Sequence, residues 1–212
     1  VAPLAGACGP RPPWYASRMI RSNPRAVVTG AGGGLGRALA KKLGERGGSV
    51  VVSDIDVAGA EETKRIVEAA GGKGFVERCD VSRAEEVEGL RDRAVGHLGG
   101  VDLIVNNAGV AVGGPIGKVP LADWDWIVGI NLMGVVYGCH FFVPMMKEQG
   151  SGHVLNVASI AGITYAPDMG PYNATKAAVV ALTETLAGEL SGKGVGATVL
   201  CPYFFQTNIH RS

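Results

Sequence analysis

A glycine-rich turn near the start of the chain constrains the fold more than any other feature. The turn, Thr29–Gly36, follows the apolar run Ala26–Val28 and opens a stretch that we predict to be helical over about 35–45. Glycines between a strand and a helix let the main chain approach a phosphate, whose charge is favourable at the helix N-terminus. The positions where a side chain would clash are Gly30, Gly34 and Gly36. The turn therefore predicts the first β-turn-α unit of a dinucleotide-binding fold.

Strand-like and helix-like stretches alternate from residue 25 onward. The apolar runs expected to form strands are Ala26–Val28, Val50–Val52, Gly74–Val76, Leu103–Val105, Val154–Val157 and Ala197–Leu200. The helices expected between them cover about 35–45, 57–70, the amphipathic stretch 87–98, 121–148 and 171–190. Ser82-Arg83-Ala84-Glu85 has the sequence of a helix capping box. Continuous apolar strands alternating with helices indicate a parallel sheet covered on both faces, so we predict a single doubly wound α/β domain of the Rossmann type.

Composition excludes several classes of function. A chain of 212 residues can bury one sizeable core, and a net charge of +1 gives no reason to expect nucleic acid or an anionic membrane surface as a partner. The four cysteines are far apart and the four histidines lack the spacing of metal ligands, so we expect no disulfide framework and no metal site. We expect a reducing, cytoplasmic location. No stretch is expected to supply the ~18 apolar residues that a membrane span needs.

Residues 1–24 differ in composition from the rest. They contain five prolines and no acidic residue, and their arginines allow a transit peptide as one interpretation. The alternative, which we favour because proline breaks an amphipathic helix, is a disordered or foreign leader, with Met19 as a possible first residue. The domain then covers 25–212.

An acidic residue ends the second expected strand. Asp54 follows Val50–Val52 and Ser53, at the distance from the glycine turn where a carboxylate binds the ribose hydroxyls of a dinucleotide. The alternative is that Asp54 and Asp56 only end the strand and cap the next helix; we assign the ribose role to Asp54 and the cap to Asp56. No basic residue replaces Gly33 or follows Asp54, so we predict NAD over NADP.

Tyr172 and Lys176 are four residues apart on an expected helix and therefore share one face. A free tyrosine has a pKa of about 10 and is a poor base at neutral pH. A neighbouring ammonium favours the phenolate, so we expect Lys176 to lower the pKa of Tyr172. A cofactor turn combined with such a pair suggests an oxidoreductase.

From residue 25 to about 210 the chain resembles the short-chain dehydrogenase/reductase family. The matching landmarks are the glycine turn, Asp80-Val81, Asn106-Asn107-Ala108-Gly109, Asn131, Ser159, Tyr172/Lys176 and Pro202 to Thr207. The resemblance implies a catalytic tetrad of Asn131, Ser159, Tyr172 and Lys176, in which Asn131 holds a water that links Lys176 to solvent. It also implies that the cofactor is bound by Gly30, Gly34, Leu35, Gly36, Asp54, Asp80, Val81, Asn107, Ala108, Gly109, Tyr172, Lys176, Pro202 and Thr207.

Two departures from the family pattern stand at the C-terminal end. Tyr203 follows Pro202 where the family usually has glycine, and Phe204 and Phe205 come next. The sequence stops at Ser212, before the helical flap and last strand that the family has, so we expect a C-terminally incomplete domain with an unpaired strand edge. We favour a fragment of a longer protein over a truncated product.

The expected substrate surface is apolar and partly aromatic. It comprises Val110, Ile163, Tyr165, Pro167, Met169 and the run Tyr203–Phe205. This surface suits a hydrophobic secondary alcohol or ketone. The resemblance also implies a homodimer or homotetramer that packs through the helices at about 121–148 and 171–190. The alternative function is a non-catalytic NAD-binding protein with a regulatory or assembly role.

Overall fold

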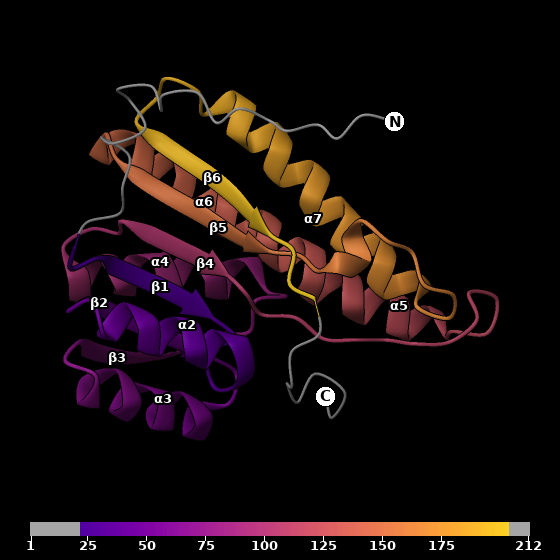
Figure 1. The fold of residues 1–212 in the computed structure, drawn as a ribbon, viewed down its shortest axis with the longest axis horizontal. Helices are drawn as coiled ribbons and strands as arrows, with labels where there is room; N and C mark the ends of the chain where they lie inside the picture. The colour runs from indigo at the N-terminus through magenta and orange to yellow at the C-terminus, as the bar shows by residue number, and fades with distance from the viewer. Residues whose placement is uncertain (1–21, 204–212) are drawn as a thin grey trace, which may run out of the picture.

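The computed structural model describes residues 22–203 and contains one parallel six-stranded sheet, in the order β3-β2-β1-β4-β5-β6 (Figure 1). The strands are β1 (Arg25–Thr29), β2 (Ser49–Asp54), β3 (Lys73–Arg78), β4 (Leu103–Asn106), β5 (Gly152–Val157) and β6 (Val195–Leu200). The helices are α2 (Gly34–Gly44), α3 (Val57–Ala69), α4 (Ala84–Leu98), α5 (Leu121–Val128), the π-helical segment η1 (Gly129–Met133), α6 (Gly134–Gln149), the 3-10 turn η2 (Ile160–Gly162) and α7 (Gly170–Glu189). The prediction of a doubly wound Rossmann-type domain is confirmed.

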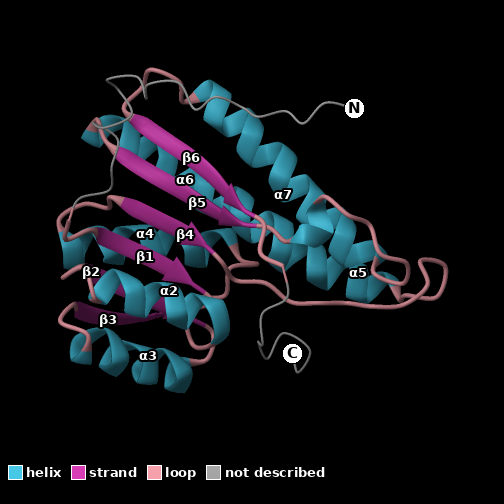
Figure 2. Ribbon diagram, viewed as in Figure 1, coloured by secondary structure: helices cyan, strands magenta, loops and turns pink. Residues whose placement is uncertain are grey.

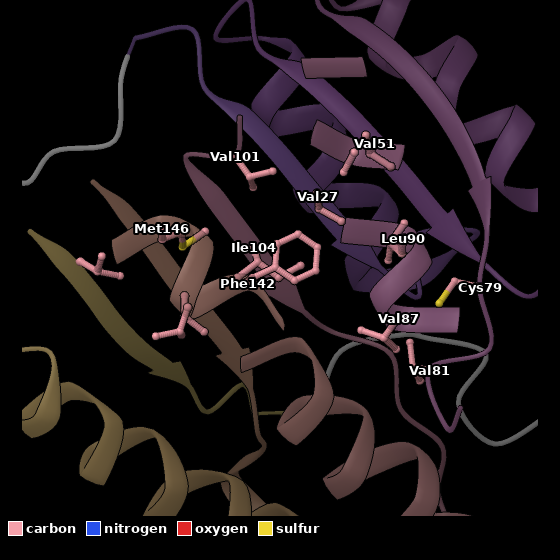
Figure 3. Packing of buried hydrophobic residues seen from close by; sticks show 14 of the residues in the cluster. Val27, Val51, Cys79, Val81, Val87, Leu90, Val101, Ile104, Phe142 and Met146 are labelled. Atoms are coloured by element: carbon pink, nitrogen blue, oxygen red, sulfur yellow. The ribbon is translucent and has the colours of Figure 1, made fainter. Parts of the chain in front are cut away.

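Successive residues of each strand face opposite sides of the sheet, as the pleat requires. Val27 and Ile104 pack in a core cluster with α4 and α6, where Figure 3 shows Phe142 and Leu90 close to them. Val28 and Val105 pack in a second cluster with residues of α2 and α3. Because both faces are covered, the central strands β1, β2 and β4 contain consecutive apolar residues rather than an alternating pattern.

Helix α7 lies on the same face of the sheet as α6. Asn156 of β5 donates from Nδ2 to the Thr183 hydroxyl of α7 at 3.0 Å, and its side chain also contacts Cys139 of α6. Asn106 of β4 donates to Asn156 Oδ1 at 2.8 Å, so this buried network joins two strands and two helices. Strand β6 pairs with β5, and within residues 22–203 it forms the edge of the sheet.

The expected caps of two helices were wrong in detail. Helix α4 begins after Arg83 rather than after Ser82, and the Ser82 hydroxyl instead donates to Asp80 Oδ1 at 2.7 Å. Asp56 does stand at the cap position of α3, but its side chain makes no capping hydrogen bond. In both turns the carboxylate two residues earlier accepts from the main chain. The N–H of Asp56 donates to Asp54 Oδ1 at 2.9 Å, and the N–H of Ser82 donates to Asp80 Oδ1 at 3.0 Å.

The long helix expected at about 121–148 is one helical rod with an irregular middle. Its π-helical segment η1 lies between α5 and α6, and η1 contains Asn131. By length and composition the whole stretch Leu121–Gln149 is apolar enough to cross a membrane, so the sequence-based expectation on this point was wrong. Core helices pass the same test, and α6 packs here against α4 and the sheet (Figure 1).

Candidate active site

The predicted site residues within 22–203 gather at the C-terminal ends of the strands. All six strands point the same way, so the turns after them meet at one edge of the sheet (Figure 2). The glycine turn follows β1, Asp54 ends β2, Asp80 and Val81 follow β3, Asn107–Gly109 follow β4, Ser159 follows β5, and Pro202 follows β6. This is the edge where open α/β sheets bind ligands, next to the point where the strand order reverses between β1 and β4.

The glycine turn is packed against the segment after β4. Gly30 has a φ of +61°, and a side chain there would place its Cβ 2.6 Å from Ala108 Cα. Asn107 donates from Nδ2 to the carbonyls of Thr29 and Gly30, at 2.8 and 3.0 Å. Thr29 Oγ1 accepts from the main-chain N–H groups of Asn107 and Ala108. Thr29 is thus a positioning residue that sequence reasoning missed, although it stands first in the glycine motif.

The turn fits the phosphates of a dinucleotide. Gly33 is the N-cap of α2, it offers no side-chain cap, and the first turn of the helix carries no acidic residue. No acidic side chain of the first turn therefore competes for the N–H groups of this helix end, and the dipole of α2 favours an anion there. No heavy atom lies within 4 Å of the position that a Cβ on Gly33 would take, which leaves space in front of the turn. Leu35 is half-buried and packs against the core beneath.

Asp54 is held beside the glycine turn by the main chain. Its Oδ2 accepts from the Gly32 N–H at 2.7 Å, and its Oδ1 accepts from the Asp56 N–H at 2.9 Å. The carboxylate is therefore fixed in position at the end of β2 while it is still partly accessible. This is the geometry of a preorganised acceptor for hydroxyl groups.

Asp80 and Val81 shape the turn after β3. Asp80 accepts from both the N–H and the hydroxyl of Ser82, and its own N–H donates to Glu86 at 2.8 Å. Val81 is buried, and a Cβ on Gly134 at the start of α6 would lie 2.9 Å from it. Val81 is therefore packed against the start of α6 and is not exposed at the C-terminal ends of the strands.

Tyr172, Ser159 and Lys176 converge where α7 passes the end of β5. Ser159 caps the 3-10 turn η2, with its Oγ accepting from the Ala161 N–H at 3.2 Å. The Lys176 Nζ is buried, donates to the Val157 carbonyl at 2.9 Å and lies 5.7 Å from the centroid of the Tyr172 ring.

The expected lowering of the Tyr172 pKa is wrong. Burial raises the pKa of the Tyr172 phenol above its usual value of 10, and a hydrogen bond with Ser159 offsets this only in part. Burial also lowers the pKa of Lys176 to about 8. The physical reason is that Lys176 is directed toward a main-chain carbonyl, in a site that penalises every charge.

Asn131 lies behind Lys176 and is engaged by the segment after β4. Its Oδ1 accepts from the Val110 N–H at 2.8 Å, and its Nδ2 donates to the Val110 carbonyl at 2.9 Å. Gly109 separates it from the lysine: a Cβ on Gly109 would lie 3.3 Å from both Asn131 Oδ1 and Lys176 Nζ. The four expected tetrad residues are thus close together, but the side-chain amide of Asn131 is already used.

The segment between Ser159 and α7 lies beside the C-terminal end of β5. The Ala166 carbonyl accepts from Asn173 Nδ2 at 2.8 Å, and the Asp168 carbonyl accepts from the Gly114 N–H at 2.6 Å. Apolar side chains are exposed here, with Ile163 54% and Tyr165 68% accessible. Pro202 accepts from the Ile160 N–H at 2.9 Å, and Tyr203 is exposed. The remaining expected residues, Phe204, Phe205 and Thr207, lie outside the described residues.

Comparison with known proteins decides the family. Residues 24–212 match the family described as short chain dehydrogenase. The chain belongs to the short chain dehydrogenase family. It is 42% identical to a short chain dehydrogenase/reductase from Burkholderia phymatum, whose crystal structure was solved in complex with NAD; the TM-score is 0.88, covering 91% of this chain and 70% of that one.

Two curated relatives show how far the match extends. The chain is 37% identical over 186 residues to 3beta-hydroxysteroid dehydrogenase 1 of Eggerthella lenta, covering 87% of this chain and 71% of the relative. It is 38% identical over 183 residues to the "probable oxidoreductase EphD" of Mycobacterium tuberculosis, covering 86% of this chain but 31% of the relative. The chain spans less than two thirds of the length of several curated relatives that it matches.

Proposed function

We propose that this short chain dehydrogenase is an NAD-dependent oxidoreductase that interconverts a hydrophobic secondary alcohol and its ketone. The observation that carries the proposal is the position of Tyr172 beside Ser159 and Lys176, at the same end of the strands as the glycine turn and Asp54, which we propose to bind the dinucleotide. A bound nicotinamide supplies the acceptor or donor of the hydride. The protein contributes orientation of the substrate and transfer of the hydroxyl proton.

Tyr172 is the proposed general acid and base. In ketone reduction its protonated phenol donates to the substrate oxygen, which suits a phenol whose pKa is raised by burial. In alcohol oxidation the phenolate must form first, so a positive charge near the ring is required. Lys176 supplies that charge, and the Ser159 hydroxyl orients the substrate oxygen. Asn131 is proposed to connect Lys176 to solvent through a water bound to its main chain.

The proposed cofactor preference is NAD over NADP. Asp54 would accept hydrogen bonds from both ribose hydroxyls and repel a phosphate on the 2′ oxygen. Its fixed position beside Gly32 supports this assignment. The NAD complex of the Burkholderia phymatum protein is consistent with it.

The proposed substrate class follows from the apolar side chains beside Tyr172. Exposed Ile163 and Tyr165 on the segment before α7 would contact an apolar ligand, whereas the described part of that segment offers a charged sugar one acidic side chain, Asp168. The name of the Eggerthella lenta relative, a 3beta-hydroxysteroid dehydrogenase, supports a secondary alcohol on an apolar skeleton.

Two measurements test this function. Thermal unfolding is measured with increasing NAD or NADP, and NAD is expected to raise the melting temperature at lower concentrations than NADP. A ligand at 100 times its dissociation constant adds about 2.7 kcal/mol to the free energy of unfolding. A panel of apolar secondary alcohols with NAD, set against polyols of similar size, is expected to yield NADH with the apolar members. NAD binding without turnover of any alcohol or ketone would favour the alternative, a non-catalytic NAD-binding protein. No binding of either dinucleotide would contradict both.

A homodimer or homotetramer is also proposed, with α6 and α7 at the interface. A groove of about 450 Å³ between these helices is lined largely by apolar side chains, including Val143, Leu182 and Leu186. Sedimentation equilibrium is expected to give a mass that is a multiple of the monomer. A monomer at all concentrations would contradict the proposal.

A further inference from the structure

Arg37, in the first turns of α2, holds the same residue of the glycine turn that Asp54 holds. Its Nη2 donates to the Gly32 carbonyl at 2.5 Å, and its Nε donates to the Thr63 hydroxyl of α3 at 2.9 Å. The N–H of Gly32 donates to Asp54. The guanidinium and the carboxylate are therefore separated only by the main chain of Gly32. A cation thus lies beside the proposed ribose site, although neither Gly33 nor the residues after Asp54 supply one.

Glu62 of α3 neutralises that cation. Its Oε2 lies 2.8 Å from Arg37 Nη2, and the two side chains are 54% and 28% exposed. Helix α3 is packed directly on the turn: a Cβ on Gly59 would lie 2.6 Å from the Gly32 carbonyl oxygen. The Gly59 carbonyl also lies 3.4 Å from Arg37 Nη2.

The charge balance at this position matters for one chemical difference between ligands. A phosphate monoester on the 2′ oxygen of the adenosine ribose carries about −1.5 to −2 charges at neutral pH, whereas a free hydroxyl carries none. Without Glu62, Arg37 would attract such a phosphate and partly offset its repulsion by Asp54. With Glu62 in place, Asp54 is left as the uncompensated charge next to the turn.

We propose that Glu62, through its ion pair with Arg37, is a specificity-determining residue that makes this site reject dinucleotides with a 2′-phosphate. The inference rests on the proposed function, because it assumes that a dinucleotide binds at the glycine turn. It adds two residues, Arg37 and Glu62, to the discrimination assigned to Asp54. Glu62 acts through Arg37 and need not touch the ligand.

The test compares two variants that change the net charge equally. Glu62→Gln removes the partner of Arg37, and Glu61→Gln removes the neighbouring exposed carboxylate on α3. The dissociation constants of NAD and NADP are measured by calorimetric titration of the whole chain. Glu62→Gln is expected to bind NADP about 3- to 10-fold more tightly, because the Arg37 charge, no longer paired at the protein surface, attracts the 2′-phosphate. The dissociation constant of NAD is expected to change less than about 2-fold. Glu61→Gln is expected to leave both constants unchanged.

A double-mutant cycle shows whether the gain passes through Arg37. In the Arg37→Met background, Glu62→Gln is expected to give no gain for NADP, because no cation remains to be released. The gain in NADP affinity of Glu62→Gln is also expected to shrink as the salt concentration is raised above 0.15 M, because the screening length is about 8 Å at 0.15 M and becomes shorter at higher salt.

The outcomes separate the inference from the function on which it rests. Binding of NAD to the unaltered protein, with no NADP gain in Glu62→Gln or with an equal gain in Glu61→Gln, would overturn the inference and leave the proposed function standing. A gain that persists without Arg37 would overturn it as well. If the unaltered protein binds neither NAD nor NADP, both the inference and the proposed function fail.

Discussion

The Lys176 ammonium lies 5.7 Å from the centroid of the Tyr172 ring and donates a hydrogen bond to the carbonyl of Val157 at 2.9 Å. The phenol stays protonated at neutral pH, since burial raises its pKa, and the lysine is easier to deprotonate than a free one. Both shifts have the same cause, the low polarity of the buried site.

Burial of Lys176 predicts a pH dependence of stability. Its pKa falls from 10.5 in the unfolded chain to about 8 in the fold, so between these values the unfolded state binds more protons and stability rises with pH. Below pH 8 both states are protonated and the full penalty of the buried charge is present. Urea unfolding at pH 7.5 to 10.5 is expected to show the protein gaining up to ~3 kcal/mol relative to Lys176→Met.

Lys193→Met, at an exposed position in the turn before β6, is the control for this measurement. It is expected to follow the pH profile of the unaltered protein. Parallel profiles for the protein and Lys176→Met would show that the lysine is not buried as described.

The sequence predicted the elements well because the signals for them are local. The runs around Val27 and Val51 are apolar at consecutive positions, as strands covered on both faces must be, and each was found within two residues of its observed bounds. Placing Tyr172 and Lys176 on one helix face required only their spacing.

What the sequence did not predict depends on side-chain direction and on contacts between distant segments. Nothing local indicates that Lys176 bonds to Val157, or that the Asn131 amide is taken up by Val110. Arg37 was overlooked because it reads as an ordinary helix cation, and its role requires α3 to pack on the turn. The π-helical segment around Asn131 has no sequence signature in this chain.

Tyr172→Phe is expected to retain NAD binding and to lose nearly all turnover. The ring still packs on α7, but no hydroxyl remains to exchange a proton with the substrate oxygen. NAD affinity from titration and turnover from NADH formation are measured on the same preparation. Tyr165→Phe is the matched control, since Tyr165 is 68% exposed, and it is expected to keep most of the activity. Near-normal turnover of Tyr172→Phe would refute its role as acid and base.

Two glycines of the turn are expected to differ sharply in their tolerance of alanine. In Gly36→Ala the new Cβ would meet the Gly30 carbonyl oxygen at 2.2 Å, so the turn must open, at a cost of about 1–3 kcal/mol. We expect a lower melting temperature and NAD affinity reduced by at least ~10-fold. Gly33→Ala meets no atom within 4 Å and its φ is −165°, so its stability should stay within ~0.5 kcal/mol. Equal effects of the two substitutions would contradict the packing described for the turn.

Asn173→Ala is expected to loosen the segment that we propose contacts the substrate, without affecting the dinucleotide site. Asn173 is 8% exposed and ties the Ala166 carbonyl to α7, at a net value of about 1 kcal/mol for such a bond. Hydrogen exchange over residues 163–168 should become faster, and KM should rise several-fold more than kcat falls. Thr164→Ala, which loses an exposed bond to Ile160 in the same segment, is the control and should leave both quantities nearly unchanged. Unaltered exchange in Asn173→Ala would mean that the bond to Gly114 alone anchors the segment, and Asn173 would then have no part in positioning the substrate.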